Sequence, residues 1–152
     1  MISQKTRYAL KALMLLASDE KKGKGPVLIS NLAKRGRIPQ KFLESILLEL
    51  KNQGILQSKK GKGGGYSLGK PSSQIMFGDI IRLMEGPLAL IPCVSQSLHH
   101  RCRDCSDDES LGIRTLFKEV RDATAQILDN TSVEKVLKVQ EQVREKPLMY
   151  FI

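Results

Sequence analysis

Three cysteines lie close together in the 152-residue chain, and their side chains are well suited to chemistry. Cys102 and Cys105 form a CxxC pair, whose two thiolates can hold one metal ion or iron atom. Cys93 precedes them, and His99 and His100 fall in the intervening segment. A fourth ligand could come from an imidazole or from Asp104, Asp107 or Asp108. The number of cysteines is odd and no signal peptide precedes them, so we expect metal, iron-sulfur or redox chemistry rather than a disulfide framework.

The charge of the chain is distributed unevenly. Residues 1–70 contain 15 Lys and Arg against 4 Asp and Glu, a net charge of +11, whereas the remaining 82 residues carry −2. A basic first half is expected if that half neutralises DNA phosphates and the second half does something else. A basic protein without a nucleic-acid partner would have no need to concentrate its charge in this way.

A glycine-rich, basic segment ends the first half. Residues 55–58 and 66–68 are predicted strands, and residues 59–65 join them as a hairpin. Glycines let the backbone approach the sugar-phosphate wall of DNA, while Lys60 and Lys62 can reach phosphates or a minor groove. In this hairpin we expect DNA contacts from Lys60, Gly61, Lys62, Gly63, Gly64 and Tyr66.

Three predicted helices precede the hairpin and must position it. Apolar residues recur at helical spacing in residues 4–18, in a short segment from 28 to 36 that Ser30 or a neighbour could cap, and in residues 39–52. Pro39 is expected in the first turn of the third helix, where proline is tolerated, and Gly54 closes that helix. The pattern predicts a mainly α fold with a winged helix-turn-helix and a two-stranded wing.

The third predicted helix begins with side chains that could read DNA bases. Next to Pro39, Gln40 suits adenine, Lys41 suits guanine, and the carboxylate of Glu44 suits the amino group of cytosine. Glu44 could also be an ordinary solvated or capping residue, but a carboxylate in so basic a half of the chain favours a role in base recognition. Three residues of the first helix are expected to contact phosphate rather than bases: Lys5, Arg7 and Tyr8.

The second half is predicted to contain a connecting helix, a cysteine-bearing sensor loop and a dimerisation helix. A long amphipathic helix covers residues 111–128, and one chain has little surface to cover its apolar stripe, so we expect it to pair with a second subunit. Packing of this helix back on the first domain is the alternative, and the two arrangements can coexist. The expected divisions are a DNA-binding domain at 1–70, a connecting helix at 71–90, a cysteine-bearing sensor loop at 91–110, a dimerisation helix at 111–130, and a C-terminal helix and tail at 131–152.

Several classes of protein are disfavoured. No nucleophile-base pairing, P-loop spacing or paired catalytic carboxylates can be found, so we do not expect an enzyme. No signal peptide or membrane-length apolar run is present, which predicts a soluble, cytoplasmic protein without a membrane partner. A structural protein of the nucleoid would share the charge but has no need of clustered cysteines.

Five short motifs resemble a known family of bacterial regulators. They are Thr6-Arg7-Tyr8-Ala9-Leu10, Phe42-Leu43-Glu44, Gly61-Lys62-Gly63-Gly64-Gly65-Tyr66, Asp79-Ile80-Ile81 and Glu85-Gly86. Together they resemble the Rrf2 family over essentially the whole chain. That family includes an iron-sulfur cluster regulator, nitric oxide and iron sensors, and a repressor of cysteine metabolism, and its members bind DNA as dimers. The resemblance implies a homodimeric transcriptional regulator, in our interpretation a repressor, that binds a palindromic operator in double-stranded DNA.

The resemblance also implies a cofactor at Cys93, Cys102 and Cys105, a 2Fe-2S or 4Fe-4S cluster. The chain departs from the pattern at Leu111, where cluster-binding relatives commonly have their last cysteine. Cys93 and Cys105 then match family cysteines and Cys102 is additional. Either Cys102 replaces the missing ligand, or the cluster has been lost and the thiols serve as redox or zinc groups.

The C-terminal residues suggest a further partner. The chain ends in Met149-Tyr150-Phe151-Ile152, and the cysteine-metabolism repressor of the family ends similarly and has cysteine synthase as its partner. A terminal carboxylate after apolar anchors is a plausible ligand for a groove on such an enzyme. The favoured alternative is that this tail packs on the dimer.

Overall fold

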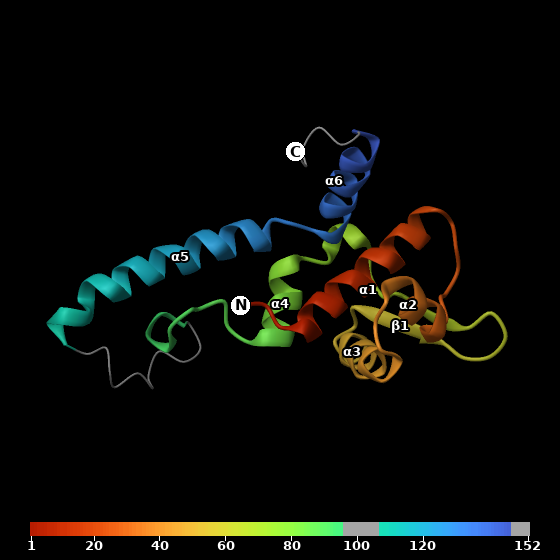
Figure 1. Ribbon diagram of the computed structural model, residues 1–152, viewed down its shortest axis with the longest axis horizontal. Helices are drawn as coiled ribbons and strands as arrows, with labels where there is room; N and C mark the ends of the chain where they lie inside the picture. The colour runs from red at the N-terminus through yellow and green to blue at the C-terminus, as the bar shows by residue number, and fades with distance from the viewer. Residues whose placement is uncertain (96–106, 147–152) are drawn as a thin grey trace.

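The computed structural model describes residues 1–95 and 107–146. The described residues are mostly helical, with one two-stranded antiparallel sheet (Figure 1). In chain order the elements are α1 (Gln4–Lys21), α2 (Ile29–Gly36), α3 (Gln40–Asn52), β1 (Leu56–Lys59), β2 (Gly65–Leu68), η1 (Ser72–Gln74), α4 (Phe77–Glu85), η2 (Pro92–Val94), η4 (Asp108–Ser110), α5 (Leu111–Asp129) and α6 (Val133–Glu145). The predicted fold class, a mainly α protein with a winged helix-turn-helix, is confirmed.

The first three helices share one apolar core. Leu13 of α1, Leu32 of α2 and Leu47 of α3 are completely buried, because the apolar residues of each helix recur on one face. Ser3 caps α1 by accepting a hydrogen bond from the Thr6 backbone N–H at 3.2 Å. Truncating a buried leucine of this core would cost about 2–5 kcal/mol.

The ends of α2 and α3 differ in detail from the predicted ones. Ser30 lies inside α2, and the N-cap is Leu28, which makes no side-chain capping bond. Pro39 is the N-cap of α3 rather than a residue of its first turn. The turn between the helices is made by Arg37 in the left-handed conformation, with φ 52°. Gly54 follows α3 with φ 72°, a conformation that favours glycine at the end of a helix.

The wing is a short hairpin tied to the start of α2. β1 pairs with β2 from Leu56↔Leu68 to Lys59↔Gly65, within one residue of the predicted strands. Val27 and Tyr66 exchange two backbone hydrogen bonds of 2.8 Å, which adds a third segment beside β2. Gly65 has φ 142°, and a Cβ there would collide with the backbone of Val27. Glycine is therefore required where the wing meets the segment before α2.

The second half of the chain divides into a packed part and an extended part. α6 packs on α1 through the buried Val133 and Leu137, and it continues to Glu145, whereas the sequence pattern predicts a helix from Thr131 only as far as Val139. α5 instead extends away from the helix-turn-helix, as Figure 1 shows. Among the described residues, no helix is long and apolar enough to span a membrane.

Candidate nucleic-acid interface and cysteine segment

The outer face of α3 is exposed along its length. Leu43, Ile46, Leu47 and Leu50 are buried, whereas Lys41, Glu44 and Leu48 lie on the opposite side and are exposed. Gln40 lies beside Glu44, with 3.5 Å between its Nε2 and a Glu44 carboxylate oxygen. The predicted base-reading residues therefore occupy one accessible surface at the start of α3.

The wing tip presents the predicted basic and glycine residues together. Lys60 and Lys62 are exposed, and Gly61 and Gly63 have φ of 89° and 74°. Gly64 is buried, and a Cβ there would collide with the carbonyl oxygen of Lys59. The tip and α2 enclose a groove of about 530 Å³, whose charged lining residues are Lys24, Arg35 and Lys62 together with Asp19, the ion-pair partner of Arg35.

The predicted phosphate-contacting residues of α1 also brace α3. Lys5 pairs with Glu49 of α3 at 2.5 Å. The Tyr8 ring lies edge-to-face with Phe42, with 6.2 Å between ring centroids and 77° between planes. Arg7 donates a hydrogen bond to Gln4 and is exposed. A DNA contact by these three residues stays a prediction.

A buried carboxylate that sequence reasoning missed joins α1 to α2. Asp19 is 2 % exposed and accepts two hydrogen bonds from Arg35, at 2.5 and 2.9 Å, with Lys24 3.9 Å away. The Arg35 guanidinium holds the pKa of Asp19 below its ordinary value. The signal available in the sequence was a single Asp at the end of a helix followed by several lysines, and it does not identify Arg35 as the partner.

Glu85, at the end of α4, is hydrogen-bonded to the start of α1. The Ser3 backbone N–H donates to the Glu85 carboxylate at 2.7 Å, and the hydroxyl of the buried Thr6 donates to the same oxygen. Hydrogen bonds from Ser3 and Thr6 lower the pKa of Glu85 to about 2. These contacts, together called the Glu85 clasp below, connect α4 to the first turn of α1, which carries Lys5.

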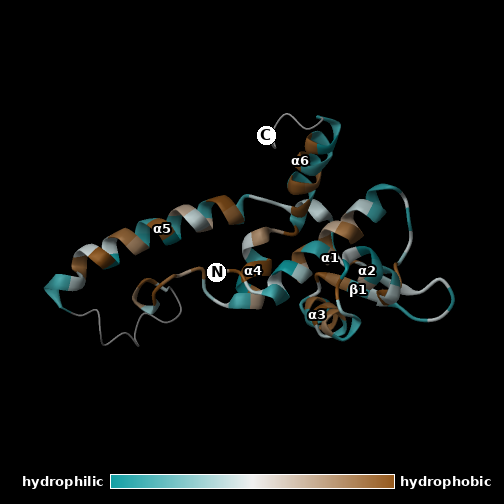
Figure 2. Cartoon of the chain, viewed as in Figure 1, coloured by the Kyte–Doolittle hydropathy of each residue, from teal (hydrophilic) through white to brown (hydrophobic). Residues whose placement is uncertain are grey.

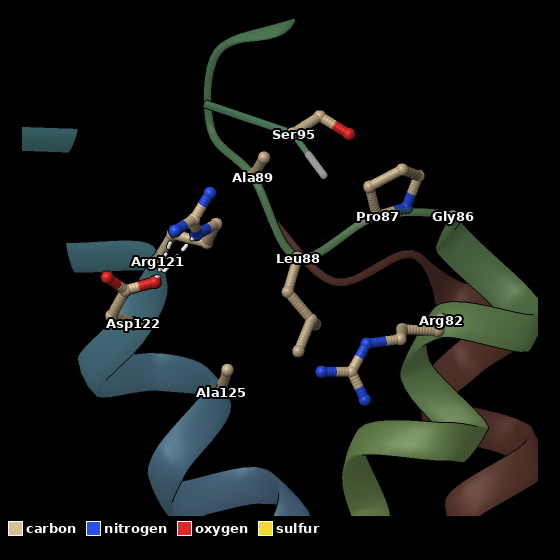
Figure 3. Close-up of a pocket in the computed structure, with 9 residues that line it drawn as sticks. All are labelled: Arg82, Gly86, Pro87, Leu88, Ala89, Ser95, Arg121, Asp122 and Ala125. Atoms are coloured by element: carbon tan, nitrogen blue, oxygen red, sulfur yellow. Dashed lines mark hydrogen bonds and ion pairs between the residues drawn. The ribbon is translucent and has the colours of Figure 1, made fainter. Parts of the chain in front are cut away.

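A second polar contact connects α4 to α5. Arg82 donates two hydrogen bonds to Asp129, at 2.6 and 2.9 Å, and this pair is called the Arg82 latch below. A cavity of about 340 Å³ lies beside it, between α4, the segment before η2 and α5 (Figure 3). On the α5 side of the cavity, Arg121 donates to the Val94 carbonyl oxygen and pairs with Asp122 at 2.5 Å.

One of the three cysteines falls within the described residues. Cys93, in η2, is 5 % exposed and disulfide-bonded. A disulfide at Cys93 is compatible with redox chemistry, one of the three expected chemistries beside metal and iron-sulfur binding. Cys102, Cys105, His99 and His100 lie outside the described residues.

The described residues do not by themselves form a site for an iron-sulfur cluster. Within 1–95 and 107–146, no three His, Cys, Asp or Glu side chains are grouped as metal ligands. Leu111, at the position of the expected last cysteine, is the first residue of α5, is 58 % exposed and offers no ligand atom. A hollow of about 370 Å³ beside Cys93 is instead lined by three cations of α5, namely Arg114, Lys118 and Arg121.

Most of the large apolar side chains of α5 are exposed in the part of the single chain that the structure describes. None of the described residues of this helix is buried, although its hydrophobic residues are spread along its whole length (Figure 2). The exposed ones are Leu111, Ile113, Leu116, Val120 and Ile127. α5 meets the rest of the chain at the Arg82 latch with α4 and through the Arg121 hydrogen bond to Val94, so partial packing on the same chain can coexist with pairing to a second copy.

Comparison with known proteins places these features in one family. Residues 2–139 match the Rrf2 family model, described as an iron-dependent transcriptional regulator. The chain is 38% identical to an rrf2-like HTH-type transcriptional regulator of Rhodobacter capsulatus, over 90% of this chain and 92% of that protein. It is 32% identical to CymR of Bacillus subtilis, with 98% of each chain covered.

Solved structures agree with the sequence comparison. The structure of CymR, the global cysteine regulator of B. subtilis, matches with a TM-score of 0.75 at 32% identity, over 91% of this chain and 97% of that one. The structure of T. potens IscR also matches with a TM-score of 0.75, at 25% identity, over 100% of this chain and 96% of that one.

Proposed function

Since the chain belongs to the Rrf2 family of transcriptional regulators, we propose that it binds operator DNA as a homodimer and that its cysteine segment controls this binding. Its relatives are transcriptional regulators, which are not enzymes. The observation that carries the proposal is the exposed face of α3 beside a basic wing, in a half of the chain with a net charge of +11. The proposal places the protein in the cytoplasm, as a repressor at a palindromic operator.

The exposed residues divide into base-reading and phosphate-contacting groups. Gln40, Lys41 and Glu44 would meet base edges, because α3 presents them on one accessible face of its first two turns. Lys60 and Lys62 would contact the DNA backbone beside the groove that α3 enters, because both lie at the tip of the wing. Lys5, Arg7 and Tyr8 would contribute less, because Lys5 is already paired with Glu49 and Tyr8 packs on Phe42.

A homodimer would cover the exposed side of α5. Two copies of Leu116 and Val120 would meet across a twofold axis, and each winged domain would then be held at a fixed distance from the other. A palindromic operator has the same symmetry, so its half-site spacing would follow from the length of α5 and the connection at α4.

Control by the cysteine segment requires a connection between Cys93 and α3. The chain supplies one through contacts already described: Val94 to Arg121 of α5, the Arg82 latch to α4, and the Glu85 clasp to α1. A change in the state of Cys93 would then bias the two winged domains between arrangements that fit the operator and arrangements that do not.

The state sensed at Cys93 has two candidate chemistries. One is an iron-sulfur cluster that draws its remaining ligands from Cys102 and Cys105, and relatives of this chain include proteins named IscR. The other is a cluster-free regulator, controlled by thiol oxidation, by zinc, or by docking of an enzyme such as cysteine synthase on the C-terminal residues, and relatives also include CymR. The disulfide-bonded, buried Cys93 favours the second.

Two measurements test the proposal. Protein purified without oxygen should be analysed for visible absorption, iron, sulfide and zinc, beside Cys105→Ala. A brown protein whose colour and iron disappear in the variant would establish cluster sensing, and a colourless, iron-free protein would exclude it.

DNA recognition is tested with Lys60→Ala and Glu44→Ala. We expect Lys60→Ala to weaken binding to all sequences and to lower the salt slope by about one unit, since one phosphate contact is lost. We expect Glu44→Ala to relax sequence preference, and an equal loss on every sequence would contradict base reading by Glu44.

A further inference from the structure

The outer face of α3 carries one large apolar side chain that the fold does not explain. Leu48 is 53 % exposed and belongs neither to the buried core nor to the partly buried side chains packed against it. Phe42, the other exposed apolar residue of α3, contacts the Tyr8 ring. Leu48 is exposed to a similar degree as Phe42, and it has no place in the core cluster that would account for it.

Leu48 shares its face with the predicted base-reading residues. It follows Lys41 by seven positions and Glu44 by four, so the three side chains lie one above another on the side opposite Leu43 and Leu50. That face is polar or charged at its other exposed positions, including Ser45 and Asn52. Leu48 would therefore contact the same partner as Lys41 and Glu44.

The proposed partner of this face has one apolar group to offer. Base edges in the major groove present hydrogen-bond donors and acceptors, and the C5-methyl group of thymine is the only alkyl group among them. Four residues of helix rise about 6 Å, which corresponds to roughly two base-pair steps of duplex DNA.

We propose that Leu48 is a specificity residue that contacts the methyl group of a thymine, about two base pairs from the pair read by Glu44 in each half-site. This inference rests on the proposed operator binding by α3. We assign DNA rather than a protein as the partner of Leu48, because the surface around it belongs to a half of the chain with a net charge of +11. Removing the methyl group from that thymine should therefore matter only while Leu48 is present.

The test begins with duplex DNA selected by the full-length protein from a random pool. Each thymine of the selected half-site is then replaced by uracil, which removes only the methyl group. We expect one position at which uracil weakens wild-type binding about fourfold, because the free energy gained by burying one methyl group against the protein is lost. In Leu48→Ala the same replacement should have no effect, while replacements elsewhere behave as in the wild type.

Two controls separate the possible failures. Leu90→Ala removes a leucine that is 67 % exposed and lies outside α3, and it should retain the uracil sensitivity of the wild type. Circular dichroism should show Leu48→Ala fully folded, because alanine is a better helix former and the side chain is exposed. If a sequence is selected but no uracil position separates wild type from Leu48→Ala, the inference is overturned and the proposed function stands. If no sequence is selected at all, the proposed function fails.

Discussion

The buried ion pair between α1 and α2 predicts a large effect for a small change, Asp19→Asn. Asp19 is 2 % exposed and accepts two hydrogen bonds from Arg35. A hydrogen bond to a charged group contributes about 1.5–3 kcal/mol. The Arg35 side chain is 34% exposed and can regain water, so we expect a loss of about 2 kcal/mol rather than the full penalty of a stranded buried charge.

A matched control is the same substitution at Asp122. Asp122 pairs with Arg121, but its side chain is 54% exposed, and exposed pairs contribute about 0–1 kcal/mol. Both variants should be unfolded with urea at one protein concentration, because dimer formation adds a concentration-dependent contribution to stability. For a chain of this size, 2 kcal/mol corresponds to a decrease in Tm of about 4–8 °C.

The pH dependence of the difference gives a second readout. Arg35 lowers the pKa of Asp19 in the folded protein, so the carboxylate stabilises the fold fully above its unfolded pKa. This stabilisation is lost as the pH falls through the lower, folded pKa. The difference between wild type and Asp19→Asn should therefore be constant near neutral pH and shrink only in acid. An Asp19→Asn variant as stable as Asp122→Asn at pH 7 would refute the reasoning.

Three further substitutions test the parts that position the DNA-binding surface. Leu116→Asp places a charge on the exposed apolar side of α5 and should convert dimers to monomers in sedimentation velocity, whereas an unchanged mass would show that α5 is not the dimer interface. Gly78→Ala puts a Cβ against the Asp129 carboxylate and should break the Arg82 latch, but both side chains of this ion pair are partly exposed and can shift, so the free energy of urea unfolding should change by less than about 1 kcal/mol; a loss of several kcal/mol would show that the latch stabilises the fold more than an exposed ion pair does. Gly65→Ala should separate the wing from Val27 and weaken binding to random-sequence DNA, and unchanged affinity would remove the wing from the interface.

Local signals predicted the helix-turn-helix and the wing. Apolar spacing in α1 and α3, together with Gly54 and the glycines of the wing, depends on residues a few positions apart, and the structure reproduces those elements closely. The end of α6 could not be predicted in the same way. The helix continues to Glu145, and Glu141, within that added part, pairs with Lys21 of α1 at 2.6 Å. A contact between residues 120 positions apart leaves no trace in local periodicity.

The polar contacts that join the helices are all of this long-range kind. Glu85 and Ser3 are 82 positions apart, and Arg82 and Asp129 are 47 apart. Each of these side chains, taken alone, would be interpreted as a solvated surface charge or a helix cap. These side chains can pair only because the apolar core places α4 between α1 and α5. The polar partners therefore cannot be identified until the packing of the core is known.

A series of polar contacts links the segment around Cys93 to the helices proposed to bind DNA. Arg121 and Asp129 both belong to α5. Arg121 donates a hydrogen bond to the carbonyl oxygen of Val94, next to Cys93, and Asp129 accepts hydrogen bonds from Arg82 of α4. α4 in turn holds the first turn of α1, where Lys5 pairs with Glu49 of α3. The two ion pairs among these links, Arg82 with Asp129 and Lys5 with Glu49, are partly exposed, so each can be exchanged for water at small cost while the apolar core stays intact. A change at Cys93 could thus reorient the winged domains without unfolding them.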